Sequence, residues 1–410
     1  MANLHLLPLL LLALLSPAGA ASGEAHASAV VAEKGLDFAK GVLIGEAVRS
    51  LTPLRLPGVE KAVRVPFLGA IRVAATNITL FHLDVGDDSA IHPGDTALVV
   101  VASGVSANLS MAWSYYYDSW LFPIEISDRG TASILVQGME VGITMQIKNY
   151  NGSLSLSVLQ CGCNVKDLVI SLDGGASWFY QGLINAFEDH IRAAVEKAIP
   201  ENIIDGTSKL DSLLQSLPRS VNLDNISALN MTFVNDPQYG NSSIEFDING
   251  LFSSATAKLS NSQKHPQLSL SCGGASKMLL LSLDEAVFNS ALEVYFKVVS
   301  ASGVAEAAGN KVYGKVELGN FSLALKWSKI GNFHMSLIQG VIRVFLNTVC
   351  MPYLNSRLGH GVILPVVHGF TLKDIYVLTS PEKLTLCSDV AFANASSLAT
   401  LPILRSPRVL

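Results

Sequence analysis

Apolar residues recur along the chain with two different spacings. Between residues 54 and 172, apolar and polar positions alternate in short runs separated by Gly, Asn and Asp, which is typical of antiparallel strands. Residues 30–51, 177–217 and 334–358 instead repeat apolar residues every three to five positions, which predicts helices. Alternation returns after each of the two later helices. The order of helix, strands, helix, strands, helix, strands predicts an α+β protein with two related halves.

Prolines and shorter apolar runs set the expected limits of the remaining elements. Thr52-Pro53 ends the first helix, because the residue before a proline disfavours helical geometry. Pro200 is expected to interrupt the second helix, which would close one end of the curled sheet. Further strands are expected at residues 230–234, 244–252, 268–271, 311–327 and 370–390, and a short helix at 283–296.

The first twenty residues have the features of a targeting segment. Residues 4–15 are apolar apart from His5 and Pro8, and Ala18-Gly19-Ala20 follows as a cleavage motif of small residues. This run is too short to cross ~30 Å of hydrocarbon at ~1.5 Å per residue. Residues 1–20 are therefore predicted to be a signal peptide. The mature protein is expected to be soluble and secreted, with the vacuole as the alternative destination.

The composition is poor in charge. Charged residues make up 15% of the chain and hydrophobic residues 50%, whereas typical soluble domains contain ~25% charged residues. The signal peptide accounts for only part of this apolar excess. Either the core is unusually large, or apolar side chains line an internal surface that would enclose a lipid tail.

Asparagine sequons agree with export. Each matches N-x-S/T without proline at the middle position, and together they predict several glycans at exposed positions. The sequons begin at Asn77, Asn108, Asn151, Asn225, Asn230, Asn241, Asn320 and Asn394.

The chain has five cysteines, so at least one thiol is unpaired or joined to another chain. Cys161 and Cys163 would lie on one face of a strand. No further ligands follow at a regular spacing, so no metal site is predicted.

The motifs of common catalytic sites are missing from the sequence. It contains no G-x-S-x-G, H-E-x-x-H or G-x-x-x-x-G-K-[ST] pattern. His360 has no acid or nucleophile at a recognisable spacing, and Asp84, Asp87 and Asp88 lack the spacing of a calcium loop. A net charge of −5, together with export, argues against nucleic acid. We therefore predict a binding protein without cofactors, and not an enzyme.

Four stretches, taken in order and spacing, resemble the family of bactericidal/permeability-increasing protein and lipopolysaccharide-binding protein in its plant-type form. They are the segment Lys34-Gly35-Leu36-Asp37-Phe38-Ala39 and residues 216–233, 277–295 and 312–389, the last including Leu354-Asn355-Ser356-Arg357-Leu358-Gly359. The resemblance implies two pseudo-symmetric antiparallel β barrels, each with a long helix and an apolar lipid pocket, joined by a central sheet in a boomerang. The implied regions are an N-terminal barrel at 21–222, a central sheet or linker at 223–282 and a C-terminal barrel at 283–410.

Two departures from the family pattern change this expectation. The family's disulfide joins a strand cysteine to the end of the following helix, but residues 200–204 contain no cysteine, so that bridge is expected to be missing. The interval between Tyr295 and Lys311 is also too short for the strands that the family places there. The second barrel is therefore expected to be shortened and incomplete.

By the same resemblance, two segments form the tip that contacts acidic head groups in bactericidal members. Residues 49–72 carry Arg49, Arg55, Lys61, Arg64 and Arg72 against one carboxylate, Glu60, and clustered cations attract phosphate. Residues 112–129 are aromatic here rather than basic, with Trp113, Tyr115, Tyr116, Tyr117 and Trp120 as candidates for a membrane interface. A solvated surface explains the first set equally well, and packing between strands explains the second.

These observations predict a secreted monomer that binds lipopolysaccharide or phospholipid through an apolar cavity and a basic tip. The resemblance implies a role at the surface of Gram-negative bacteria, in defence. The alternative is a general extracellular lipid carrier without an immune role, which would show weak selectivity for head groups. A secreted hydrolase is the third possibility, but the sequence offers no nucleophile and base for it.

Overall fold

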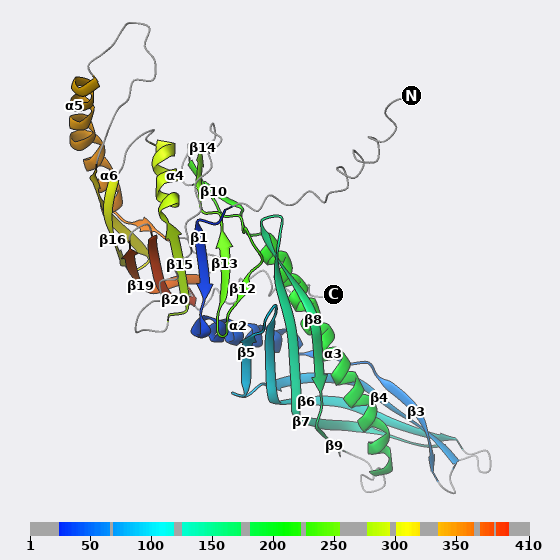
Figure 1. Cartoon of the computed structure of the whole chain (residues 1–410). Helices are drawn as coiled ribbons and strands as arrows, with labels where there is room; N and C mark the ends of the chain where they lie inside the picture. Colours follow the sequence, from blue (N-terminus) through cyan, green and yellow to red (C-terminus); the bar gives the residue numbers. More distant parts are fainter. Residues whose placement is uncertain are drawn as a thin grey trace, which may run out of the picture.

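The computed structural model describes residues 24–65, 69–118, 125–173, 181–222, 227–254, 277–295, 301–319, 335–364, 370–380 and 383–392. The predicted signal peptide and the strand expected at 268–271 lie outside these ranges. The described elements form an elongated molecule, with strand β3 (Val59–Val65) towards one end and helix α5 (Met335–Phe345) at the other (Figure 1).

One eight-stranded antiparallel sheet dominates the N-terminal half. Its main path is β2–β4–β6–β7–β8, and β3, β5 and β9 pair along its long strands. Ile71, Val73 and Ala75 of β4 are buried while the residues between them are not, which is the alternation seen in the sequence. The strands predicted between residues 54 and 172 are thus confirmed. Their bounds are β2 (Leu54–Arg55), β4 (Gly69–Asp84), β5 (Ser89–Pro93), β6 (Leu98–Asp118), β7 (Glu125–Tyr150), β8 (Ser153–Asn164) and β9 (Asp167–Asp173).

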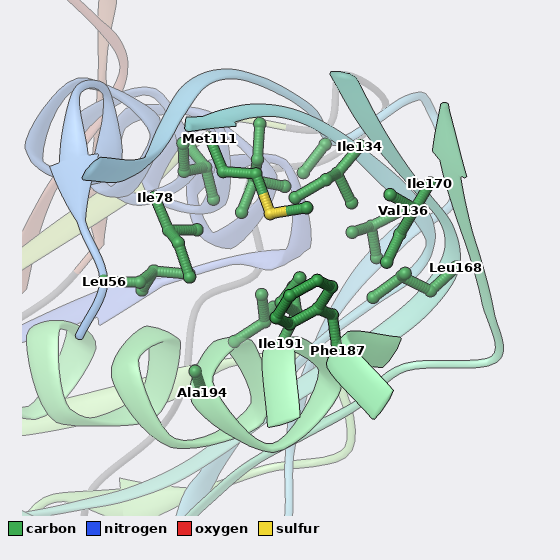
Figure 2. Packing of buried hydrophobic residues seen from close by; sticks show 14 of the residues in the cluster. Leu56, Ile78, Met111, Ile134, Val136, Leu168, Ile170, Phe187, Ile191 and Ala194 are labelled. Atoms are coloured by element: carbon green, nitrogen blue, oxygen red, sulfur yellow. The ribbon is translucent and has the colours of Figure 1, made fainter. Parts of the chain in front are cut away.

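Helix α3 (Gln181–Gln215) lies across the inner face of this sheet. Phe187, Ile191 and Ala194 point from the helix towards apolar side chains of the strands (Figure 2). The predicted interruption at Pro200 is wrong, because α3 continues through it. Packing along both halves of the helix outweighs the local cost of the proline, since tertiary contacts supply most helical stability in proteins.

Carboxylates of α3 also satisfy the free edge of the sheet. The Glu196 carboxylate accepts a hydrogen bond from the backbone N–H of Val165 at 2.9 Å, just beyond β8, and Asp211 accepts one from Leu156 within β8 at 2.7 Å. An unpaired strand edge invites pairing with other chains. The helix therefore both fills the concave face and covers the edge strand.

A six-stranded sheet, in the order β12–β13–β1–β15–β20–β19, joins the two halves. It draws strands from all three regions expected from the sequence. Residues 30 and 31, expected to begin the first helix, belong instead to β1, and helix α2 (Glu33–Leu51) starts after them. The strands are β1 (Ala27–Val31), β12 (Gln238–Tyr239), β13 (Ile244–Ile248), β15 (Leu279–Asp284), β19 (Phe370–Ser380) and β20 (Lys383–Phe392).

Shorter elements complete the described C-terminal half. The predicted short helix is α4 (Glu285–Tyr295), and the predicted helix at 334–358 is α5 followed by a π-helical turn, Leu346–Cys350, and α6 (Met351–Gly359). Strands β16 (Ala301–Ala308), β17 (Lys311–Leu318) and β18 (Val362–Ile363) form a three-stranded sheet, and β10 (Ser220–Asn222), β11 (Ser227–Asn230) and β14 (Phe252–Ser254) form another. Closure of a second barrel stays a prediction.

Two apolar clusters occupy the N-terminal half. The larger lies between the curled sheet and α3, and the smaller lies where β5 to β8 approach the central sheet. Among the described helices, none combines the length and the apolar character needed to cross a bilayer.

Candidate functional site

The middle of α2 carries apolar side chains that the protein covers only in part. The helix reaches both clusters, since Leu36 belongs to the smaller one and Leu51 to the larger. Between them Val42, Leu43 and Ile44 follow one another around the helix, and each is only half-buried. They belong to residues 41–45, a stretch without charge between Lys40 and Glu46. Successive residues point ~100° apart around a helix, so the three side chains present a broad apolar surface that the described protein covers only in part.

The N-terminal end of α2 is held firmly against the central sheet. A Cβ atom at Gly35 would collide with the main-chain oxygen of Met278, so only glycine permits this approach. The backbone N–H of Ala32 donates to the same oxygen at 3.0 Å. The motif Lys34-Gly35 thus fixes where the apolar helix lies.

An ion pair and an aromatic cluster tie the same helix to the C-terminal strands. The Asp389 carboxylate of β20 lies 3.1 Å from both the Lys34 and the Lys277 ammonium groups. Burial alone would raise the pKa of Asp389, but hydrogen bonds from the two lysines outweigh it and lower the pKa. Phe38 contacts the rings of Phe370 and Phe392 at centroid distances of 6.2 and 5.7 Å.

Further half-buried apolar residues surround the smaller cluster. They come from β7 and from the C-terminal part of α3, and they pack against Leu36 and its buried neighbours without being enclosed themselves. These residues are Ile143, Ile147, Leu210 and Leu214. Like the middle of α2, these residues are apolar and only partly covered, which is the kind of surface that can hold an alkyl chain.

The five basic residues of the predicted tip do not form one cluster. Arg49 lies at the end of α2, where its guanidinium is 3.5 Å from the Glu46 carboxylate. Arg55 lies opposite Thr79 of β4, whereas Arg64 lies opposite Ala70 of the same strand. At ~3.3 Å per residue, positions 70 and 79 are up to about 30 Å apart. The side chain of Arg64 is outside the described part.

Strand register separates the remaining two cations. Lys61 lies opposite Val73, on the face that carries the core, although its side chain is exposed. Arg72 is exposed on the other face, directly opposite Tyr116 of β6. Four of the five cations have described side chains. Of these, only Arg72 therefore lies on the outward face next to an aromatic residue.

The aromatic residues of β6 divide by the same alternation. Trp113 is 3% exposed and donates its indole N–H to the Thr131 carbonyl at 3.0 Å. Tyr115 and Tyr117 are half-buried against the same core. Tyr116 faces outward and is 39% exposed. Trp113, Tyr115 and Tyr117 therefore pack between strands. Of the described aromatic candidates, only Tyr116 has the exposed position expected of an interface residue. Trp120 lies outside the described residues.

Register also reveals a cation that reasoning from the sequence missed. Arg129 of β7 lies opposite Ser114, and Tyr116 lies opposite Ser127, two residues away. Residues in such diagonal positions are ~7 Å apart on one face. Arg129 is exposed. Arg72, Tyr116 and Arg129 therefore form an outward patch across β4, β6 and β7, and only the pairing of these strands could have shown it.

The described sequons occupy different settings. Asn77, Asn151 and Asn241 are exposed, and Asn108 and Asn230 are half-buried. The side-chain oxygen of Asn230 accepts hydrogen bonds from the backbone N–H and the hydroxyl of Thr232, at 3.0 and 2.8 Å. Asn225, Asn320 and Asn394 lie outside the described residues. Occupancy of all eight stays a prediction.

The cysteines agree with the expected loss of the family's disulfide. Cys161 and Cys163 are free, and the Cys161 sulfur lies 4.0 Å from the main-chain oxygen of Pro200, where a bridging residue would stand. Burial raises the pKa of the Cys163 thiol to about 12, with Glu196 and Cys161 adding to the effect. Cys387 is in a disulfide, whereas Cys350 is free. Within the described ranges, no three His, Cys, Asp or Glu side chains converge as a metal site would require.

The class of this protein follows from its architecture. A long helix lies on a curled antiparallel sheet, and a central sheet links this half to a second half of helices and strands. Residues 35–217 match the N-terminal domain of the LBP / BPI / CETP family, and residues 298–392 match its C-terminal domain. The chain belongs to this family, whose members bind or transfer lipids.

Individual relatives agree with this assignment. A putative BPI/LBP family protein of Arabidopsis thaliana is 38% identical over 465 aligned positions, which cover 93% of this chain and 95% of that protein. The lipopolysaccharide-binding protein of Homo sapiens is 22% identical over 94% of this chain and 98% of its own. A crystal structure of lipopolysaccharide binding protein has a TM-score of 0.69 at 17% identity, covering 90% of this chain and all of that one.

The Arabidopsis alignment also bears on the length of this chain. The alignment has 465 positions, whereas this chain has 410 residues. The Arabidopsis protein therefore carries residues that have no counterpart here. This agrees with a shortened chain, and the location of the shortening stays a prediction.

Proposed function

We propose that the protein binds amphipathic lipid, with alkyl chains lying against the middle of α2 and the neighbouring surface of the smaller cluster. The observation that carries this proposal is the half-buried state of Val42, Leu43 and Ile44 on a helix that is otherwise fixed at both ends. Burial of apolar surface stabilises by ~25 cal/mol per Å², so two alkyl chains would supply most of the affinity. Binding of this kind needs no covalent chemistry.

The finer proposal is recognition of lipopolysaccharide or anionic phospholipid by a secreted, glycosylated protein acting against Gram-negative bacteria. Arg72 and Arg129 would donate charge-assisted hydrogen bonds to phosphate, and Tyr116 would lie at the boundary between head groups and water. The name of the human relative supports this choice of ligand.

The lipid cavity is tested by substitution on α2. Protein secreted from two unrelated hosts should yield phospholipid after organic extraction and mass spectrometry. Leu43→Gln with Ile44→Gln should reduce the lipid content severalfold, because two polar amides would then face the alkyl chains. The matched control is Val169→Gln with Ile204→Gln, two apolar residues that are already exposed. Equal lipid content in the α2 variant and the parent would refute the site.

The outward patch is tested separately. Arg72→Glu with Arg129→Glu should weaken binding to lipopolysaccharide at low salt by roughly tenfold, while leaving neutral phospholipid in the protein. Lys197→Glu with Lys315→Glu, at two exposed positions of other surfaces, is the matched charge reversal. Unchanged affinity in the patch variant would remove the head-group assignment and leave the α2 site standing.

The second candidate function is a general lipid carrier. It is favoured by the dispersal of the predicted basic tip, because separated cations give weak selectivity for acidic head groups. Transfer of fluorescent phosphatidylcholine between neutral vesicles, at a rate that added lipopolysaccharide does not reduce, would decide for the carrier.

A further inference from the structure

The C-terminal helices carry a row of exposed apolar side chains. Val341, Phe345, Val349 and Tyr353 follow one another at intervals of four residues along α5, the π-helical turn and α6, and each is between 50% and 71% exposed. Val344, next to Phe345, is also mostly exposed. Residues four apart lie on one side of a helix. We call these five residues the outer ridge.

The opposite side of the same helices packs against the rest of the protein. Leu346 and Met351 are buried. The Asn355 side chain accepts a hydrogen bond from the backbone N–H of Val316 at 2.7 Å and donates one to its carbonyl at 2.9 Å, which fixes α6 on β17. The orientation of the ridge towards solvent is therefore set by packing. It lies at the end of the molecule remote from β3 and β4 (Figure 1).

Charge along the ridge has a single sign. The sequence from residue 318 to residue 373 contains no Asp or Glu, and Arg343 and Arg357 are the cations within α5 and α6. The Arg357 guanidinium lies 5.6 Å from the centre of the Tyr353 ring and donates to its hydroxyl at 3.3 Å. On β17, Glu317 is paired with Lys315 at 3.2 Å. Exposed apolar residues flanked by arginines are typical of helices that lie in a lipid interface.

A second copy of the chain fits this surface poorly. A symmetric pair would bring the same patch together from both molecules. Arg343 and Arg357 would then face apolar and cationic residues of the other copy, and the paired segments contain no carboxylate to offset the loss of water. An anionic lipid surface instead offers both hydrocarbon and phosphate.

We propose that the outer ridge docks the C-terminal end of the molecule on the surface of an anionic lipid bilayer. Val341, Val344, Phe345 and Val349 enter the boundary between head groups and acyl chains, while Arg343 and Arg357 contact lipid phosphates. This surface is separate from the α2 site and from the outward patch of Arg72, Tyr116 and Arg129. The protein would thus contact a bilayer with its C-terminal end, hold lipid near its middle at α2, and recognise head groups through the outward patch.

The experiment is vesicle flotation with the full secreted chain, using phosphatidylcholine vesicles with and without phosphatidylglycerol. The ridge variant combines Val341→Gln, Phe345→Gln and Val349→Gln. Its partitioning onto phosphatidylglycerol vesicles should fall by roughly tenfold, because three apolar anchors are lost. The matched control, with Phe81→Gln, Leu159→Gln and Val169→Gln at exposed positions of the N-terminal half, should partition like the parent.

A second variant tests the charge. Arg343→Glu with Arg357→Glu should remove the preference for phosphatidylglycerol over phosphatidylcholine, since polybasic surfaces bind anionic leaflets electrostatically. Both variants are also made with Arg72→Glu and Arg129→Glu, so that binding through the outward patch is excluded. A loss that persists in this background supports the ridge whether or not the patch binds lipid.

Two results would overturn the proposal. One is equal partitioning of the parent and the ridge variant onto phosphatidylglycerol vesicles in the patch-reversed background. The other is a parent protein that sediments as a dimer while the ridge variant sediments as a monomer. That result would assign the ridge to contact between copies. Circular dichroism and thermal unfolding of each variant confirm that the chain remains folded.

Discussion

Trp113 and Gly130 form a matched pair across β6 and β7. They lie opposite each other in the strand register, and a Cβ atom at Gly130 would come within 2.8 Å of the indole ring. Trp113→Ala would leave a cavity beside the largest core of the protein, at a cost of roughly 3–5 kcal/mol. Chemical denaturation should measure this loss, and Tyr116→Ala, on the outward side of the same strand, should cost less than about 1 kcal/mol. Similar losses for the two variants would contradict the division of these aromatics.

Cys163 is expected to be chemically inert despite being a free thiol. Its pKa of about 12 has burial as its main cause, so the thiol stays protonated at pH 8. Ordinary thiols ionise near pH 8.5. Labelling of Cys163 by Ellman's reagent should therefore be slow in the folded protein through about pH 9 and fast in guanidinium chloride. Rapid labelling of the native chain at pH 8, located to Cys163 by peptide mapping, would show that the site opens readily.

The ion pair of Asp389 stabilises the junction between α2 and the C-terminal strands. Asp389→Asn removes the charge that holds Lys34 and Lys277, and should cost roughly 1–3 kcal/mol at pH 7, between the values for exposed and buried pairs. Because the folded-state pKa is lowered, this stability is present above the unfolded value of about 3.9. It is lost as pH falls through the folded value.

Denaturation midpoints at several pH values test this junction. The difference between the parent and Asp389→Asn should be full at pH 7 and should shrink as the pH falls below about 3.9. Asp374→Asn, at an exposed position of the neighbouring strand β19, is the control and should have little effect at either pH. A difference that grew as the medium became acidic would mean that the carboxylate is not stabilised by the lysines.

Most strands were predictable from their alternating pattern, whereas strand β1 and the length of helix α3 were not. The strands between residues 54 and 172 pair with their neighbours along the chain, so alternation alone identified them. Strand β1 was missed because its partners are β13 and β15, more than 200 residues away. Helix α3 passes through Pro200 because the sheet beneath it, rather than local propensity, decides its length.

At the level of the whole molecule, the sequence predicted which kinds of residue would form the site but not where they would meet. The apolar excess in the composition predicted a lipid-binding surface, but it did not point to the middle of α2, where we propose that this surface lies. The basic residues near one another in sequence were expected to cluster. Strand register instead spreads them along β4, and it places Arg72 of β4 and Arg129 of β7 on either side of Tyr116 of β6. Spacing along the chain cannot report which strands are neighbours, so the outward patch required the fold.

Lipid bound against α2 should stabilise the molecule as a whole. This helix contacts the larger cluster, the smaller cluster and the C-terminal strands, so a ligand that covers its middle reinforces the junction of the two halves. A ligand that binds only the folded state adds about 2.7 kcal/mol at a hundredfold excess over its Kd. For a chain of this size, that corresponds to a rise in Tm of at least a few degrees.

Differential scanning fluorimetry of delipidated protein, with and without short-chain phospholipid, measures this rise. The parent should gain Tm in proportion to the logarithm of the lipid concentration, and Leu43→Gln with Ile44→Gln should gain little, because its helix no longer offers an apolar surface. The ridge variant should gain as much as the parent, since its substitutions lie on α5 and the π-helical turn, away from α2. If the α2 variant were stabilised as strongly as the parent, the stabilising lipid would have to bind elsewhere, and α2 would be a structural link between the halves and not the floor of the lipid site.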